Sequence, residues 1–450
     1  MLTRMNRRHA VGISLGASAA LYSGWVLADD PTPTPEPTPE PINIGEGDVE
    51  INMWVQNFGP VITSFQAAAQ AYIDKNPGVK VVVQPIPYAD LQAKMLPAVA
   101  AGNEADILLG YTNWYLATDI SRLWLNLDDS FGGRAAIEEL VYPGALGLIE
   151  TPEDKTYYLP YLTGLDGVTL TLNQQHYIDA GIDYSTFTTW EEYVEAGKTL
   201  TQVDGDTVSR AGLSCASTAY YMLGSFIYQA GGNFFDKESG TWSYATPEGE
   251  AALQRIYDLI WTDKTASLTL AASDADGFLE GSISTISSGA YLAGSANGVS
   301  PDRKTDVVGL PTIAGAVEDV VSPYNLAVIT LSRRLADDET KRNHCVGIVN
   351  EMLSADSMIE ITNSYSGILC SPRLYADPRI ETTKYGALSK KVAEATFSRA
   401  RYPQGRVANT GPAQIEIDRA MNQEISIAEA LKNVDAYMNE QEQTARERLG

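Results

Sequence analysis

The residues that could carry out catalysis are few, and their spacing excludes most active sites. The chain holds three histidines and three cysteines, and no CxxC pair is present to begin a metal site. A serine motif of the form G-x-S-x-G occurs once, at 12–16, inside an N-terminal targeting segment. Neither a phosphate-binding P-loop nor a G-x-G-x-x-G turn is present. We therefore predict no metal, no cofactor and, apart from one class of hydrolase, no enzyme activity.

The net charge of the chain excludes one further class of partner. Fifty-seven acidic residues against thirty-two basic ones give a formal charge of −25. A surface of this sign repels a phosphate backbone, so we expect no nucleic-acid partner. The same acids leave one enzyme class open, because a glycoside hydrolase needs only two suitably spaced carboxylates. That alternative stays open, since the sequence cannot locate such a pair.

The residues best suited to binding follow predicted strands. In α/β sheets, ligands bind beyond the carboxyl ends of the strands. Amide side chains can hydrogen-bond the polar groups of a ligand, and aromatic rings can pack against its apolar faces. Six such residues follow the first and third predicted strands: Gln56, Asn57, Phe58, Tyr111, Asn113 and Trp114. Trp54, within a strand, is instead assigned to the core.

Alternating strands and helices are predicted to position these residues. Apolar periodicity predicts these elements in the order strand 49–55, helix 60–75, strand 79–83, helix 88–101 and strand 106–109. Asn76-Pro77-Gly78 is expected to end the first helix. Such a succession favours parallel strands with helices on the faces of the sheet.

A second α/β run is predicted from about residue 167. Residues 168–172 alternate as a strand, and Thr189-Trp190-Glu191-Glu192 is a capping box that opens a helix. Residues 248–261 are amphipathic, and 415–448 have the composition of one or two terminal helices. No repeat of the length found in solenoids or propellers is present.

The N-terminus has the features of an export signal. Arg4, Arg7 and Arg8 precede an apolar run that ends in Val26-Leu27-Ala28. This pattern predicts a secretory signal over 1–28, cleaved after Ala28. Retention as a membrane anchor stays the alternative, and the Arg7-Arg8 pair leaves the Sec or twin-arginine route open. Export implies the periplasm or the extracellular face of the membrane.

A linker is predicted over 29–47. Its residues 31–41, PTPTPEPTPEP, are expected to form an extended polyproline spacer of about 35 Å. A disordered leader is the plainer reading. A stalk makes most sense if the anchor is retained.

The order of motifs along the chain resembles the extracellular solute-binding proteins that deliver sugars to ABC importers, the maltose-binding-protein-like family. The matching segments, in chain order, are VEINMWV, FQAAAQAYIDKNPGVKVVV, AAGNEADILLG, SRLWLNLDD, YYLPYLTGLDGVTLTLNQQHYIDAGID, FTTWEEYVEAGKTLT, IYQAGGNFFD, ATPEGEAALQRIYDLI, FLEGSISTISSGAY and VVGLPTIAG. Each alone is weak, but ten in order over about 400 residues are specific.

The resemblance implies an α/β, two-lobed periplasmic-binding-protein fold. Each lobe is then a mainly parallel sheet flanked by helices, with a ligand cleft between the lobes. Lobe one would comprise 48–160 plus 316–370, and lobe two 161–310 plus 371–450. Hinges are expected at Pro160 and Leu310-Pro311.

The resemblance also implies a binding protein. It would capture a sugar or oligosaccharide by hinge closure, as a monomer, and deliver it to the transmembrane permease subunits. A sugar sensor that reports to a membrane receptor is the alternative with the same site. Relatives also bind non-sugar solutes, but no Arg or Lys cluster on the predicted loops favours a phosphorylated ligand.

Further ligand residues follow from the resemblance. They are Asp166, Tyr221 with Tyr220 competing for its place, Tyr291, Tyr324, Asn325 and Asn409 with its neighbour Thr410. Tyr291 stands where the family usually has tryptophan, and Ser282, Ser284 and Thr285 replace a basic or apolar stretch. These departures bear on which ligand is bound. Pairing of Cys215 with Cys370 and three unpaired cysteines stay open alternatives.

Overall fold

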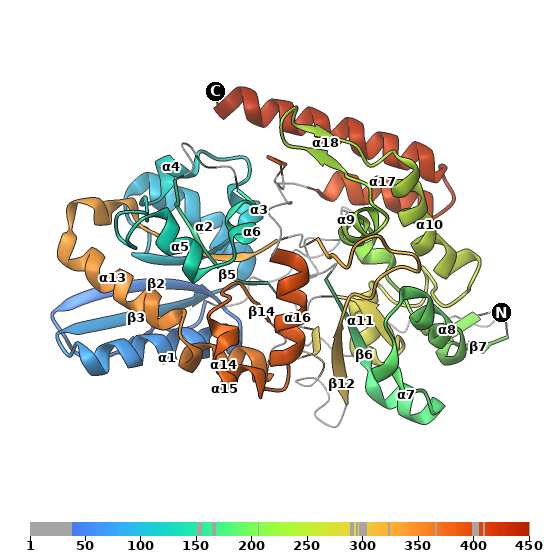
Figure 1. The fold of residues 1–450 in the computed structure, drawn as a ribbon, viewed down its shortest axis with the longest axis horizontal. Helices are drawn as coiled ribbons and strands as arrows, with labels where there is room; N and C mark the ends of the chain where they lie inside the picture. Colours follow the sequence, from blue (N-terminus) through green and yellow to red (C-terminus); the bar gives the residue numbers. More distant parts are fainter. Residues whose placement is uncertain are drawn as a thin grey trace, which may run out of the picture.

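Two lobes form the molecule (Figure 1). Lobe one is built on a seven-stranded sheet and lobe two on a three-stranded sheet. The computed structural model describes residues 38–149, 151, 155–163, 168–205, 207–288, 292–293, 296, 304–322, 325–364, 367–397, 405–407 and 410–449.

The large sheet is organised around β2, whose residues alternate between the two faces. Across the sheet, the strands are β1 (Ile42–Ile44), β3 (Val79–Ile86), β2 (Val49–Gln56), β4 (Ile107–Tyr111), β13 (Ala327–Leu331), β5 (Leu159–Thr163) and β14 (Ile368–Leu369). Ile51, Met53 and Val55 are fully buried. Because β3 and β4 flank β2 on opposite sides, right-handed crossovers place α1 (Gly59–Lys75) and α2 (Tyr88–Ala101) on opposite faces (Figure 1).

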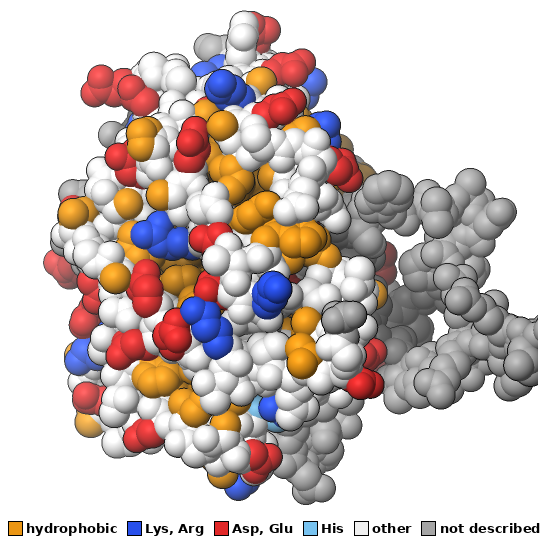
Figure 2. Space-filling view, turned by 90° about the vertical axis from the view of Figure 1, so that its right-hand side faces the viewer, with side chains coloured by type: hydrophobic (Ala, Val, Ile, Leu, Met, Phe, Trp, Pro, Cys, Tyr) orange, Lys and Arg blue, Asp and Glu red, His pale blue; other side chains and the backbone are white. Residues whose placement is uncertain are grey.

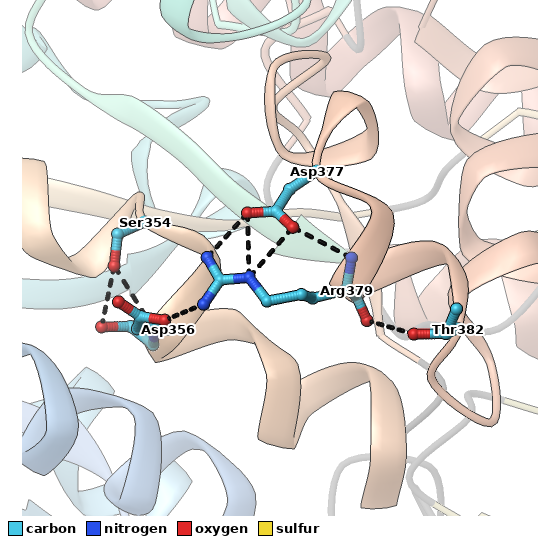
Figure 3. Close-up of polar contacts among 6 residues, drawn as sticks. Ser354, Asp356, Asp377, Arg379 and Thr382 are labelled. Atoms are coloured by element: carbon cyan, nitrogen blue, oxygen red, sulfur yellow. Dashed lines mark hydrogen bonds and ion pairs between the residues drawn. The ribbon is translucent and has the colours of Figure 1, made fainter.

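The remaining helices of lobe one surround the same sheet. They are α3 (Thr112–Tyr115), α4 (Ile120–Leu123), α5 (Arg134–Leu140), α6 (Pro143–Leu146), α13 (Glu339–Met352), α14 (Ala355–Ser364), α15 (Pro378–Glu381) and α16 (Gly386–Phe397). Helix α1 packs against α13 and α14. Arg379 joins α15 to α14 through Asp356, and it also pairs with Asp377 at the start of its own helix (Figure 3). Arg379 and Asp356 are exposed and Asp377 is partly exposed, so the ion pairs contribute little to stability.

Lobe two contains the sheet β11 (Thr285–Ser287), β6 (Thr169–Asn173) and β12 (Thr305–Gly309). The helices are α7 (Gln174–Ala180), α8 (Trp190–Leu200), α9 (Ala219–Gln229), α10 (Pro247–Trp261), α11 (Asp274–Glu280), α17 (Gly411–Met421) and α18 (Ile427–Leu449). Two hairpins complete it, β7 (Gln202–Asp204) with β8 (Thr207–Arg210), and β9 (Phe235–Asp236) with β10 (Thr241–Trp242). Every residue of α9 is buried, so this helix is the core of lobe two.

Strand direction differs from the prediction of mainly parallel sheets. Among the named strands of the described residues, only the pairs β2–β3 and β2–β4 are parallel. Every pair in the small sheet is antiparallel. The large sheet is mixed because the chain returns from lobe two through β13, which pairs antiparallel with β4. A local strand–helix–strand pattern does not contain that information.

The two sheets are joined by chain crossings and by α16. The chain passes from β5 to β6, and returns from β12 to β13. Helix α16 contacts β14 and α6 of lobe one as well as β12 of lobe two. Helix α15, which follows the predicted boundary at residue 370, contacts α14 of lobe one as well as α16. The predicted boundaries and hinges remain predictions.

Most local predictions match the described elements. Helix α1 ends at Lys75, before Asn76-Pro77-Gly78. The Thr189–Glu192 capping box is formed at the start of α8, and Trp190 packs edge-on against Phe226 in the core. The predicted linker is shorter than 29–47, because Ile42 and Ile44 alternate with a polar residue and Ile42–Ile44 forms β1.

The cysteines and the surface complete the description. Cys215, Cys345 and Cys370 are all buried and unpaired, so the Cys215–Cys370 disulfide is not formed. Acidic side chains are spread over the face seen in Figure 2 and are not collected in one patch. In the part of the chain that the structure describes, no helix has the length and apolar character needed to cross a membrane.

Candidate functional site

The ends of three strands bring the predicted binding residues together. Strands β2, β3 and β4 are parallel and stop at one end of the large sheet, called here the carboxyl end. Antiparallel β13 starts at this end, because Ala327 pairs with Tyr111. Strand β5 finishes there too, since Leu162 also lies opposite Ala327. The crossings to lobe two therefore leave the sheet where the candidate residues lie.

Three aromatic rings form the centre of this site. The ring centroids of Tyr88, Tyr111 and Trp114 lie 5.0 to 5.2 Å apart in all three pairs. Trp114 donates from Nε1 to the Tyr88 hydroxyl at 3.1 Å, and Tyr111 donates from its hydroxyl to the Gln56 side-chain oxygen. The cluster fixes the rings against each other, and Trp114 is only 5% exposed. Trp114 therefore supports the two tyrosines more than it offers an open stacking face.

Burial reinforces the neutral state that the Tyr88 phenol has near pH 7. It raises the pKa of this phenol, and hydrogen bonds from Trp114 and Asn113 act in the opposite direction. Tyr88 therefore stays neutral near pH 7 and offers a neutral hydroxyl. The hydrogen bonds described within the cluster join neutral groups, which suits a polar, uncharged ligand.

Asn113 is the side chain with an unused acceptor. Its backbone N–H donates to the Asn325 side-chain oxygen at 3.2 Å. Its own side-chain oxygen is buried without a hydrogen-bond partner among the described residues. Since a buried acceptor of this kind costs free energy, it is well placed to accept from a bound hydroxyl.

Asn57 and Phe58 lie at the start of α1, beside the cluster. The Asn57 N–H donates to the Ile86 oxygen at 2.7 Å, which continues the pairing of β2 with β3 by one residue. Phe58 precedes the first residue of α1 and provides no side-chain cap. Both residues are partly exposed. They lie where β2 and β3 end side by side.

Asn325 has a strong positioning role. Its side-chain oxygen accepts from the Thr112 hydroxyl at 2.7 Å as well as from Asn113. Its backbone oxygen accepts from Thr163 at 2.9 Å. The residue is 4% exposed, so it ties the returning chain to β4 and β5.

Tyr221 lies in lobe two, on α9. Both Tyr220 and Tyr221 are buried, with ring centroids 5.6 Å apart. Tyr220 packs inward, because its hydroxyl lies 3.1 Å from that of Tyr244. One turn beyond Tyr221, Ser225 accepts from the N–H of Ser322 at 2.9 Å. Ser322 and Asn325 are three residues apart, so their Cα atoms are separated by at most about 11 Å. Ser322 contacts α9, and Asn325 contacts Asn113 beside the aromatic cluster.

Four predicted ligand residues lie outside the described residues: Asp166, Tyr291, Tyr324 and Asn409. Thr410, next to the last of them, is buried at the start of α17.

Tyr88 is the member of the cluster that the sequence argument missed. It follows β3 directly, after Pro87. The rule that selects residues after the first and third strands applies equally to the second. Tyr88 is predicted to lie at the start of a helix, and for that reason it is not considered as a ligand residue.

No metal centre is formed in the described part of the chain, where no group of three His, Cys, Asp or Glu side chains could hold an ion. Asp106, at the opposite end of β4, has a structural role. It accepts from the N–H of Asn52 and pairs with Lys341, both at 2.8 Å.

Comparison with known proteins identifies relatives of this architecture. One is an arabinooligosaccharide-binding protein of Halalkalibacterium halodurans, 25% identical over 232 residues, which are 50% of this chain and 48% of the relative. The chain thus matches about half the length of this curated relative.

Two solved structures share the fold over nearly their whole length. The cyclic alpha-maltosyl-1,6-maltose binding protein of Arthrobacter globiformis has a TM-score of 0.68 and 17% identity, covering 87% of this chain and 98% of its own. The maltose/maltodextrin-binding domain of Bdellovibrio bacteriovorus, bound to maltotriose, has a TM-score of 0.66 and 16% identity, with coverages of 89% and 100%.

The family model described as bacterial extracellular solute-binding protein matches residues 59–333, more than half of the chain. That span contains α1, the aromatic cluster, the crossing to lobe two and the return through β13. The chain therefore belongs to the family of bacterial extracellular solute-binding proteins.

Proposed function

We propose that the protein captures a sugar or oligosaccharide outside the cytoplasm and delivers it to the permease of an ABC importer. The observation that carries the proposal is the neutral polar and aromatic cluster at the carboxyl end of the large sheet, where the chain crosses between lobes. Its amide oxygens and phenol hydroxyls suit the hydroxyls of a sugar, and its rings suit the C–H faces. Membership of a solute-binding family favours capture without chemistry.

The proposed ligand residues come from both lobes. Lobe one would contribute Tyr88 in addition to Gln56, Asn57, Phe58, Tyr111, Asn113, Trp114, Tyr324 and Asn325, and lobe two Tyr221, Tyr291 and Asn409, with Asp166 at the crossing. A ligand held by both lobes favours their closed arrangement by its differential affinity for that state. The closed form would then dock on the permease.

The similar proteins guide the choice of ligand. One relative is named for arabino-oligosaccharides, and one structural neighbour holds maltotriose. We therefore expect a neutral oligosaccharide, and these two series are the first to test.

A thermal-shift and calorimetric screen tests the proposal directly. Arabino-oligosaccharides and malto-oligosaccharides of two to six units would be titrated against the purified mature chain. A ligand at one hundred times its Kd stabilises the folded state by about 2.7 kcal/mol, which raises the melting temperature measurably. Glycerol 3-phosphate and spermidine serve as charged comparisons. Stabilisation by a charged solute alone would contradict the proposal.

The same mixtures distinguish binding from hydrolysis. After overnight incubation, chromatography should return each oligosaccharide intact. Release of shorter sugars would instead assign the chain to the glycoside hydrolases.

A further inference from the structure

Strand β1 reverses the chain before the rest of the fold begins. Ile42 pairs with Val83 and Ile44 with Val81 in antiparallel register. The chain therefore runs along β1 toward the amino end of the large sheet, and then turns back into β2. Residues that precede Ile42 lie toward the carboxyl end. The Gln84 side chain confirms this direction, because its Nε2 donates to the Pro39 oxygen at 2.8 Å.

Two glycines form the turn between β1 and β2. Gly45 has a φ of +77°, and a Cβ there would lie 2.8 Å from the Val79 oxygen. A Cβ on Gly47 would lie 2.0 Å from the Gly78 carbonyl carbon. Both contacts are with backbone, which cannot move aside as a side chain does. The reversal therefore depends on glycine at these positions.

The reversal changes where the N-terminal segment joins the folded body. Without β1, the chain would enter at Val49, at the amino end of β2. Strand β2 is eight residues long, so this point is about 26 Å from the carboxyl end. With β1, residues 38–41 lie at the carboxyl end, on the outer side of β3. That is also the end that carries Tyr88, Tyr111 and Trp114.

We propose that the N-terminal segment joins the folded chain at the end of the large sheet that carries the ligand site. A protein that is held to a surface by this segment would then have its ligand site facing that surface. The functional part rests on the export proposed above. If residues 1–28 are retained as an anchor, that surface is the membrane, and the partner served by the site is embedded in it. The proline-rich segment would then act as a spacer between site and membrane.

Distances between spin labels test where the segment joins. Thr38→Cys would be paired with Ala89→Cys in one full chain and with Asn103→Cys in another. All three residues are exposed, and Ala89 and Asn103 lie near opposite ends of α2, which is about 21 Å long. The native cysteines are buried, so labelling is directed to the new ones. We expect the 38–89 distance to be shorter than the 38–103 distance by about 10 Å or more. Equal distances, or the reverse order, would overturn the proposal.

A turn variant tests whether β1 causes this placement. Gly47→Val should detach β1 and broaden the 38–89 distance distribution. Gly78→Ala is the matched control, because it lies on the other side of the same contact and a Cβ there meets nothing within 4 Å. It should leave the distribution unchanged. An unchanged distribution in Gly47→Val would show that the turn does not position the segment.

Orientation on a membrane needs a second measurement. Residues 1–28 would be replaced by a histidine tag bound to nickel-chelating vesicles that contain an acceptor-labelled lipid. Energy transfer from a donor dye at Ala89→Cys should exceed that from Asn103→Cys. Equal transfer would refute the orientation. Neither readout uses a ligand, so failure of the sugar screen and failure of this proposal are distinguishable.

Discussion

Asn113 has an amide oxygen that no described residue satisfies, although its surroundings are buried. Asn113→Ala should therefore lower the free energy of unfolding by only about 1 kcal/mol, because the variant loses the side-chain hydrogen bond to Tyr88 but no hydrogen bond to this oxygen. Affinity for the sugar should fall about 10- to 100-fold, since a bound hydroxyl loses its acceptor. Calorimetry on the variant and on Asn103→Ala, an exposed control, measures both effects. A large loss of stability with unchanged affinity would assign Asn113 to the scaffold.

Asp418 is the carboxyl group whose burial predicts a pH-dependent stability. Burial, with a smaller contribution from Asp274, raises the pKa of Asp418 from 3.8 to about 6, and a hydrogen bond from Gln414 opposes the shift. The folded state thus favours the protonated acid. Its stabilising effect is complete below about pH 4 and is lost as pH rises through 6. Asp418→Asn should therefore stabilise the chain by about 1–2 kcal/mol at pH 8 and change little at pH 3.5.

The matched control for Asp418 is on α1. Asp74 accepts from Gln70 at 2.7 Å with the same four-residue spacing, but it is exposed. Denaturation of Asp74→Asn at both pH values should show no such gain. Equal stabilisation by both variants would show that burial is not the cause.

At the scale of elements, the close packing of α1 against α13 depends on a glycine in α13, which has no side chain. A Cβ on Gly347 of α13 would lie 2.2 Å from the Tyr72 ring, and Tyr72 is held by a 3.0 Å contact with His344. Gly347→Ala should destabilise the chain by about 1–3 kcal/mol through overpacking. In a Tyr72→Ala background, the same change should stabilise it, because alanine favours helix. A double-mutant cycle in urea measures the difference, and equal effects in both backgrounds would contradict this account.

The elements that were predictable are those that local chemistry specifies. Asn76-Pro77-Gly78 stops α1, and the Thr189–Glu192 box starts α8, because each acts within a few residues. The strand-end rule predicted that Gln56 and Tyr111 lie close together, although they are far apart in sequence, because parallel strands end at the same edge of the sheet. It did not show that Trp114 is covered by two tyrosines or that Asn325 is a bridging residue. The first depends on how the ends of neighbouring strands pack, as in the Trp114–Tyr88 hydrogen bond. The second depends on contacts between segments some 200 residues apart, as in the Thr112–Asn325 hydrogen bond.

At the scale of the whole molecule, the returning chain is held at both ends of its crossing. On lobe two, the Gln229 side chain donates to the Val320 oxygen at 3.1 Å and accepts from the Ile313 N–H at 2.9 Å. On lobe one, Asn325 binds Thr112 and Asn113. Both side chains are buried. The described residues on either side of the crossing are therefore anchored, one set to each lobe.

This arrangement predicts a measurable coupling between the two anchors. Gln229→Ala and Asn325→Ala should each cost about 1–3 kcal/mol, because each leaves buried polar groups unsatisfied. Once one anchor is lost, the segment can relax, so the second loss should cost less. We expect the double variant to be more stable than the sum of the single losses by at least about 0.5 kcal/mol, although the anchors are on different lobes. Urea denaturation of the four chains measures this energy. Strict additivity would mean that each anchor stabilises only its own lobe, and that the crossing does not link the two bodies energetically.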